Sequence, residues 1–234
     1  MSTAEHTTSS HETSGMTSFR SHWFPVAAVH DVPFRHVHQA ELLGQELAVW
    51  RADDGFVNVW ENRCLHRGVR LTLGINLGDS LKCQYHGWLY SSRSSACTYI
   101  PAHPENAPAR LICNKVYPAV ERYGLIWSRL DGDPDMAPVP ALEDRPWLAL
   151  RGIPVKAPAD RIEALLVREG FTRCTDFMFR NDDDGLVLMV QPENTGRCVL
   201  RGLARETPQA DDLKVLLDCN VRLIGLRDAV EARQ

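Results

Sequence analysis

Several features that would mark a membrane, secreted or nucleic-acid-binding protein are missing from this sequence. No apolar run reaches the length of about 18 residues that suggests a transmembrane helix, and no basic patch accompanies the net charge of −4. Residues 1–21 are rich in Ser, Thr, His and Glu, but they lack the apolar core of a signal peptide and any twin arginine. We therefore expect a cytoplasmic protein that binds neither membrane nor nucleic acid, with a disordered tail over residues 1–21.

Histidine is absent from residues 104–234, although the chain holds nine histidines in all. No glycine-rich dinucleotide fingerprint is present, so the sequence does not indicate a flavin or nicotinamide cofactor. Two of the seven cysteines fall in the motifs described below. The others show no paired spacing, and we expect them to be reduced, as in a cytosol; they are Cys97, Cys113, Cys174, Cys198 and Cys219.

What the chain does contain is a pair of short motifs that each join one cysteine to one histidine. The first is Cys64-Leu-His66, and the second, after sixteen intervening residues, is Cys83-Gln-Tyr-His86. A Rieske [2Fe–2S] cluster takes two cysteine thiolates on one iron and two histidine imidazoles on the other. Zinc sites usually bring their ligands as C-x-x-C and H-x₃₋₅-H pairs instead. The pattern therefore predicts these four residues as the ligands of a Rieske cluster.

The sequence around these motifs resembles the Rieske domain of ring-hydroxylating and demethylating non-haem iron oxygenases. The resemblance is carried by residues 61–71 and 81–88, the latter reading Leu-Lys-Cys-Gln-Tyr-His-Gly-Trp, and it extends from about Trp23 to Trp127. It points to the large subunit of these enzymes rather than to their small ferredoxin. The resemblance implies a Rieske-type [2Fe–2S] cluster as the cofactor.

The resemblance also implies roles for the residues of the two motifs. His66 and His86 are expected to pass electrons outward, because the ring nitrogen that does not bind iron needs an acceptor. In the family this acceptor is an aspartate on the neighbouring subunit. Three further residues are expected to pack over the cluster and exclude water, with ordinary core packing as the alternative for the last of them; they are Arg67, Tyr85 and Trp88.

Respiratory-chain Rieske proteins differ from this sequence at three positions near the ligands. They carry an extra cysteine in each loop and a serine that donates to a cluster sulfur, where this chain has Val69, Tyr85 and Trp88. Fewer donors to the sulfurs stabilise the reduced cluster less. We therefore expect a reduction potential toward the low end of the Rieske range.

The chain lacks the histidines of a second iron site. Full-length oxygenases of this family hold a mononuclear iron in a two-histidine, one-carboxylate site written D-x₂-H-x₄-H, whereas this chain has no histidine after His103. We therefore expect an electron-transfer subunit that serves a partner oxygenase subunit carrying the mononuclear iron, in a trimeric or hexameric assembly. A separate NAD(P)H-dependent reductase or ferredoxin would supply the electrons. A freestanding Rieske ferredoxin and a non-catalytic redox-sensing or assembly subunit stay open as alternatives, so whether the chain is an enzyme component is also open.

The predicted fold class is mainly β, with an antiparallel Rieske β domain followed by a reduced α+β domain. We expect the Rieske domain over residues 22–130 and a Pro/Asp-rich linker over residues 131–147. A shortened catalytic-domain-like unit without an iron site is expected over residues 148–234. In this unit the pattern predicts a helix over 157–170, a small antiparallel sheet, and a closing amphipathic helix over 211–234. The three strands predicted for the sheet are 171–179, 185–191 and 196–205.

Overall fold

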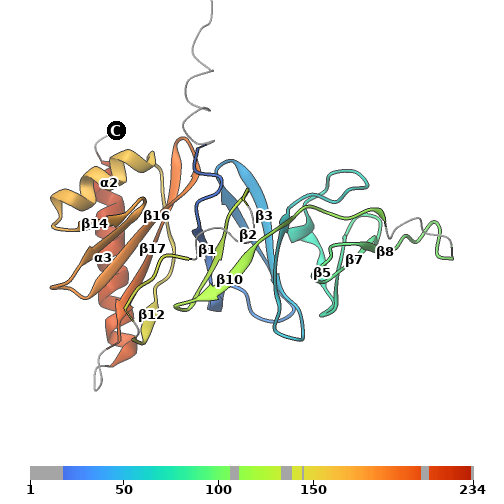
Figure 1. The fold of residues 1–234 in the computed structure, drawn as a ribbon, viewed down its shortest axis with the longest axis horizontal. Helices are drawn as coiled ribbons and strands as arrows, with labels where there is room; N and C mark the ends of the chain where they lie inside the picture. Colours follow the sequence, from blue (N-terminus) through green and yellow to red (C-terminus); the bar gives the residue numbers. More distant parts are fainter. Residues whose placement is uncertain (1–17, 106–110, 133–138, 144, 207–210, 233–234) are drawn as a thin grey trace, which may run out of the picture.

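The computed structural model describes residues 18–105, 111–132, 139–143, 145–206 and 211–232. Most of the predicted tail over residues 1–21 and part of the predicted linker lie outside these ranges. The described chain is elongated, with one small sheet at one end, the largest sheet and two helices at the other, and two sheets between them (Figure 1). None of its helices is long and apolar enough to cross a membrane.

Two antiparallel sheets form the middle of the molecule, one with strand order β1-β11-β10 and one with strand order β2-β3-β4-β9. Their strands are β1 (Phe24–Ala28), β2 (Val37–Leu42), β3 (Gln45–Arg51), β4 (Val57–Glu61), β9 (Val116–Tyr117), β10 (Ala119–Arg122) and β11 (Leu125–Ser128). Buried side chains from both sheets, among them Leu47, Val59 and Ile126, form one shared core. The short 3-10 helix η1 (Val29–Asp31) follows β1.

A third antiparallel sheet, with order β5-β6-β7-β8, lies at the right-hand end of Figure 1. Its strands are β5 (Ile75–Asn76), β6 (Ser80–Lys82), β7 (Leu89–Ser91) and β8 (Cys97–Tyr99), and the 3-10 helix η2 (Leu71–Leu73) precedes them. The core beneath this sheet contains Cys64 and Cys83 together with Trp50, Trp60 and Tyr90. The two tryptophan rings meet edge to face at 5.0 Å. Both motif cysteines are thus held in a core rich in aromatic side chains.

The fourth sheet has strand order β12-β17-β16-β15-β14, and β13 pairs separately with β17. Its strands are β12 (Trp147–Ala149), β13 (Ile153–Val155), β14 (Thr172–Thr175), β15 (Met178–Asn181), β16 (Leu186–Asn194) and β17 (Arg197–Arg205). Helices α2 (Ala159–Arg168) and α3 (Asp212–Glu231) pack on one face, where they meet Leu186, Leu188 and Val190 of β16. The alternate residues Val187 and Met189 pack against β1 and β11. Strand β16 reads as a continuous apolar run because both of its faces are buried.

The mainly β fold with a terminal α+β unit is confirmed, but the prediction of one strand over residues 171–179 is wrong. The segment forms the hairpin β14–β15, which turns at Asp176-Phe177. Phe177 has φ of 60°, a left-handed conformation that is rare for an aromatic residue and that no glycine in the sequence announces. Its ring packs against Phe19 at 4.8 Å and Phe24 at 5.1 Å, which holds the turn in place.

The predicted helix over 157–170 is confirmed as α2, and the C-terminal helix is confirmed as α3, but α3 does not have a single apolar face. Leu223, Leu226 and Val230 are buried against the sheet, whereas the earlier residues Leu213, Leu217 and Val221 are exposed. The apolar positions therefore fall on two sides of the helix. The predicted boundary over residues 131–147, between β11 and β12, stays a prediction.

Buried polar contacts join the C-terminal sheet to the middle sheets. Arg201 on β17 donates from Nη2 to the Val26 carbonyl at 2.6 Å and from Nε to Gln191 Oε1 at 2.9 Å. Gln191 in turn donates from Nε2 to the Glu41 carbonyl at 2.7 Å. Burial lowers the pKa of Arg201 to about 10, and the Asp31 carboxylate lies 3.7 Å from its Nη1. The two parts are thus connected by a desolvated guanidinium that remains charged at neutral pH.

We expect Arg201→Met to lower the free energy of unfolding by about 3–5 kcal/mol, because it leaves the Val26 carbonyl and the Gln191 amide oxygen without their charged partner. The matched control is Arg180→Met, which removes an exposed guanidinium paired with Asp182 at 3.1 Å. The control should cost no more than about 1 kcal/mol. Urea unfolding followed by tryptophan fluorescence measures both; equal losses would show that the buried joint is not a major source of stability.

Candidate metal centre

The two motifs occupy loops with the same backbone hydrogen bonds. In the first, Cys64 N donates to Val69 O at 2.8 Å and Gly68 N to Cys64 O at 2.7 Å. In the second, Cys83 N donates to Trp88 O at 2.8 Å and Gly87 N to Cys83 O at 3.1 Å. Each loop therefore closes from its cysteine to the fifth residue beyond it.

A glycine occupies the fourth position after the cysteine in both loops. Gly68 and Gly87 each have φ of 70°, in the left-handed region that a side chain disfavours. The two loops are thus local copies of one conformation, presented from different strand connections. The first follows β4 and the second joins β6 to β7.

The copied loops place the cysteines inside and the histidines outside. Cys64 and Cys83 are buried, whereas His66 and His86 are exposed, with ring centroids 4.6 Å apart. All four predicted ligands are therefore brought to one end of the molecule. The arrangement suits a cluster whose inner iron takes the two thiolates and whose outer iron takes the two imidazoles.

The surroundings of the thiols include hydrogen-bond donors that a metal-bound thiolate can accept. Burial raises the pKa of the Cys83 thiol, and the neighbouring Cys64 thiol raises it further. The backbone N–H groups of Tyr85 and His86 act in the opposite direction by donating to Cys83. These donors suit a metal-bound thiolate, which can only accept hydrogen bonds. The residues present therefore fit the cluster.

Tyr90 on β7 is a second source of hydrogen bonding that the sequence analysis missed. Its hydroxyl lies 3.2 Å from Cys64 Sγ and accepts from Leu65 N at 3.2 Å. Burial raises the pKa of Tyr90, so the phenol keeps its proton and donates it to a thiolate at Cys64. The comparison with respiratory-chain Rieske proteins at Val69, Tyr85 and Trp88 therefore counted too few hydrogen-bond donors to the cluster sulfurs. The sequence feature that could have indicated this donor is a tyrosine two residues after Trp88, the last residue of the second loop.

The three residues predicted to cover the cluster differ in burial and in what they contact. Trp88 stacks on His66 with ring centroids 4.8 Å apart and planes 10° apart, and it is half-buried. The Tyr85 ring lies against the His86 ring with centroids 3.8 Å apart, but Tyr85 is itself exposed. Arg67 is exposed too, and its charge, after desolvation and His66, lowers the pKa of His86. This favours the neutral imidazole that binds metal. The prediction that these residues exclude water stays untested.

Among the residues that the structure describes, no three His, Cys, Asp or Glu side chains converge closely enough to hold a single metal ion. A Rieske cluster does not require such a group, because each of its two irons takes only two protein ligands.

Comparison with known proteins agrees with this geometry. Residues 22–121 match the family model for the Rieske [2Fe-2S] domain. The oxidoreductase NdmD of Pseudomonas putida is 52% identical over 122 residues, which are 52% of this chain and 21% of NdmD. The methylxanthine N1-demethylase NdmA of the same organism is 38% identical over 130 residues, which are 52% of this chain and 35% of NdmA. The chain thus spans about a fifth to a third of the length of these curated relatives.

The fold likeness extends over nearly the whole chain. The structure of NdmA from Pseudomonas putida CBB5 superposes with a TM-score of 0.72 at 20% identity, covering 94% of this chain and 81% of that one. Apo dicamba monooxygenase gives a TM-score of 0.72 at 18% identity, covering 91% and 86%. The chain therefore contains a Rieske domain, which takes a [2Fe–2S] cluster. This domain is related to components of Rieske oxygenase systems.

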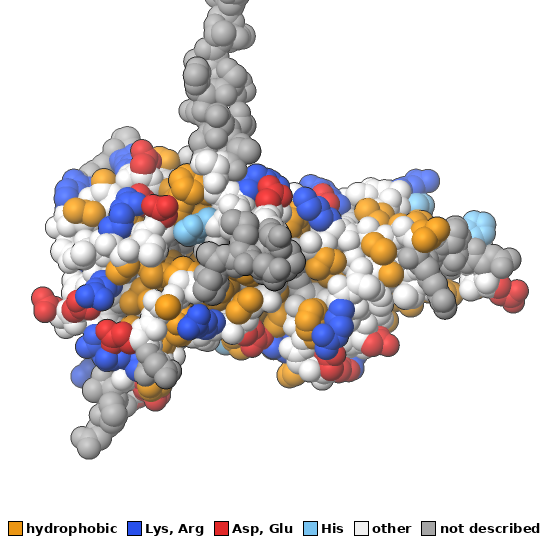
Figure 2. Space-filling view, in the orientation of Figure 1, with side chains coloured by type: hydrophobic (Ala, Val, Ile, Leu, Met, Phe, Trp, Pro, Cys, Tyr) orange, Lys and Arg blue, Asp and Glu red, His pale blue; other side chains and the backbone are white. Residues whose placement is uncertain are grey.

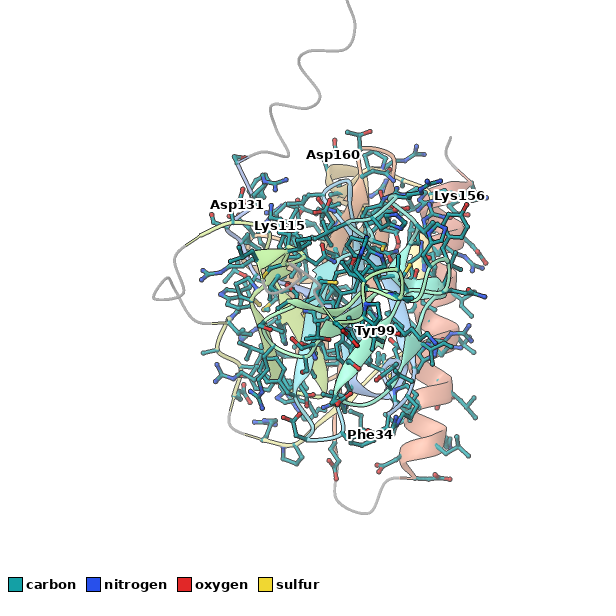
Figure 3. All side chains as sticks on the ribbon, turned by 90° about the vertical axis from the view of Figure 1, so that its right-hand side faces the viewer. Phe34, Tyr99, Lys115, Asp131, Lys156 and Asp160 are labelled. Carbon is teal, nitrogen blue, oxygen red and sulfur yellow. The ribbon has the colours of Figure 1, made fainter. Side chains whose placement is uncertain are left out.

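We expect Tyr90→Phe to lower the reduction potential of the cluster by about 60 mV, the equivalent of a tenfold change in the one-electron equilibrium. The phenol donates to a sulfur that becomes more electron-rich on reduction, so its loss disfavours the reduced state. The control is Tyr99→Phe, which alters an exposed ring on β8 that faces the viewer in Figure 3. A redox titration followed by electron paramagnetic resonance measures both; an unchanged potential in Tyr90→Phe would contradict the assigned hydrogen bond.

Proposed function

We propose that this protein is the Rieske electron-transfer subunit of a hetero-oligomeric oxygenase. It delivers electrons to the mononuclear non-haem iron of a partner oxygenase subunit. The observation that carries the proposal is the exposure of His66 and His86 beside buried Cys64 and Cys83. When bound, the cluster supplies reversible one-electron transfer. The exposed imidazoles are the part of the site that a partner can touch.

Each residue of the site has a defined task in this proposal. The ring nitrogens of His66 and His86 that do not bind iron offer their N–H groups to an acceptor on the partner. Trp88, stacked on His66, fixes the orientation of that ring. Tyr90 holds the Cys64 sulfur from the inner side.

The surface around the two histidines has the character of a docking face. Leu65 and Tyr85 flank them and are 45% and 57% exposed. Figure 2 shows hydrophobic and histidine side chains together at this end of the molecule. Arg63, Arg67 and Arg70 add positive charge, and Glu46 pairs with the first and the last of these. A partner with an apolar centre and an acidic rim fits this face.

The C-terminal unit favours a subunit over a freestanding ferredoxin. It shares its fold with the oxygenases, and it is fastened to the Rieske part through Arg201 and Gln191. Residues 104–234 nevertheless contain no histidine to complete the two-histidine iron site of such enzymes. The proposal therefore places oxygen activation on another chain. A separate NAD(P)H-dependent reductase or ferredoxin supplies the electrons that this chain delivers.

A single-turnover experiment tests this function. The chemically reduced protein is mixed with a Rieske oxygenase chain whose own cluster ligands have been replaced, together with that oxygenase's substrate and oxygen. We expect the cluster to reoxidise at least about tenfold faster than in oxygen alone, with product formed. Reoxidation that is unaffected by any such chain, with no product, would favour the ferredoxin or sensor alternatives.

We expect Leu65→Ser to slow this transfer about tenfold, because it truncates the apolar centre of the docking face. The spectrum of the cluster should stay unchanged. Val167→Ser is the matched control, since Val167 is also exposed but lies on α2 at the opposite end of the molecule (Figure 1). Equal effects of the two substitutions on the rate would contradict docking through the histidine end.

A further inference from the structure

A cavity of about 530 Å³ opens where the C-terminal sheet meets the middle sheets. Its walls come from the first described residues of the chain, the β2–β3 turn, the start of α2, and the hairpins β14–β15 and β16–β17. Figure 1 shows the start of the described chain, α2 and the β16–β17 hairpin gathered at the top of the molecule. The volume lies within the range of small-molecule sites. The cavity has no part in the electron-transfer site.

One part of the cavity wall is apolar and aromatic. Phe19 and Phe177 meet edge to face, with centroids 4.8 Å apart and planes 87° apart, and both line the cavity. Leu43 and Pro192 line it as well. The left-handed backbone of Phe177 brings this ring to the cavity, and strained conformations of this kind concentrate at functional sites.

The polar part of the wall carries more negative than positive charge. Three carboxylates line the cavity, those of Asp160, Glu163 and Asp176, against one guanidinium, that of Arg173. Arg173 pairs with Glu163 and lies 3.8 Å from Asp176.

Asp160 accepts a hydrogen bond from the Arg161 backbone N–H at 2.8 Å and lies at the top of the molecule in Figure 3. Its negative charge is not balanced by the guanidinium of Arg173, which is already engaged with Glu163. Aromatic rings beside three carboxylates and a single guanidinium form a combination that attracts an organic cation.

We propose that this cavity binds an organic ammonium ion with an apolar body, of the arylalkylamine class. The body packs on Phe19, Phe177 and Leu43, and the ammonium group lies beside Asp160 and Asp176. An organic anion is repelled by the same carboxylates. A neutral compound of the same shape gains the apolar contacts only.

The bound amine also contacts both parts of the chain. Leu43 N donates to the Pro192 carbonyl at 3.0 Å, so these two lining residues already join the β2–β3 turn to β16. A ligand that packs on both residues binds only where this junction is formed. Binding therefore raises the unfolding temperature of the protein by mass action.

Three isosteric probes test the proposal on the cluster-loaded full chain: 3-phenylpropylamine, 3-phenylpropan-1-ol and 3-phenylpropanoate. Calorimetry measures affinity, and thermal unfolding measures stabilisation. We expect the amine to bind at least about tenfold more tightly than the alcohol, the difference a charged hydrogen bond provides, and the carboxylate not to bind. Only the amine should raise the unfolding temperature markedly.

Neutralising substitutions locate the binding. Asp160→Asn and Asp176→Asn should each weaken amine binding about fivefold or more and leave alcohol binding unchanged. Asp183→Asn, an exposed carboxylate in the β15–β16 turn outside the cavity, is the matched control and should change neither. The cluster's visible absorption reports that each variant is folded.

Three results would overturn the proposal. Equal affinity for amine and alcohol would reduce the cavity to an apolar groove without charge selectivity. Amine binding that is insensitive to Asp160→Asn and Asp176→Asn would place the site elsewhere. Absence of amine binding up to millimolar concentration would show that the cavity does not hold this class of ligand.

Discussion

The Rieske part of the chain depends on one constraint. Two buried cysteine thiols must be held side by side while the histidines a few residues away stay at the surface. The solution is one loop conformation used twice, with Gly68 and Gly87 in the same left-handed conformation. The core under the loops, which includes Trp50, Trp60 and Tyr90, fixes the cysteine end. The histidine end is left exposed, and this exposure supports the proposed electron-transfer role.

The C-terminal unit follows a different constraint, since its central strand β16 is buried on both faces. One face takes α2 and α3 and the other takes β1 and β11, so the unit cannot separate from the Rieske part without exposing apolar surface. Arg201 and Gln191 add directional contacts to this joint. The cavity proposed as an amine site lies at this junction.

Local patterns in the sequence predicted much of this structure, and long-range contacts account for what was missed. The spacing of Cys64, His66, Cys83 and His86 predicted a metal centre because ligand type and order are local properties. Tyr90 was overlooked because its role depends on a fold that brings β7 beneath the first loop. The hairpin at Phe177 had no glycine to announce it, and packing on Phe19 and Phe24 stabilises it. Arg201 meets a carbonyl 175 positions away, which no sequence window contains.

In the proposed function, this chain carries electrons and another chain holds the iron centre that activates oxygen. The most direct test is the iron and acid-labile sulfide content of anaerobically purified protein. The account predicts about two irons and two sulfides per chain, as one Rieske cluster requires. A third iron without additional sulfide would reveal a mononuclear site within the chain and would contradict the account.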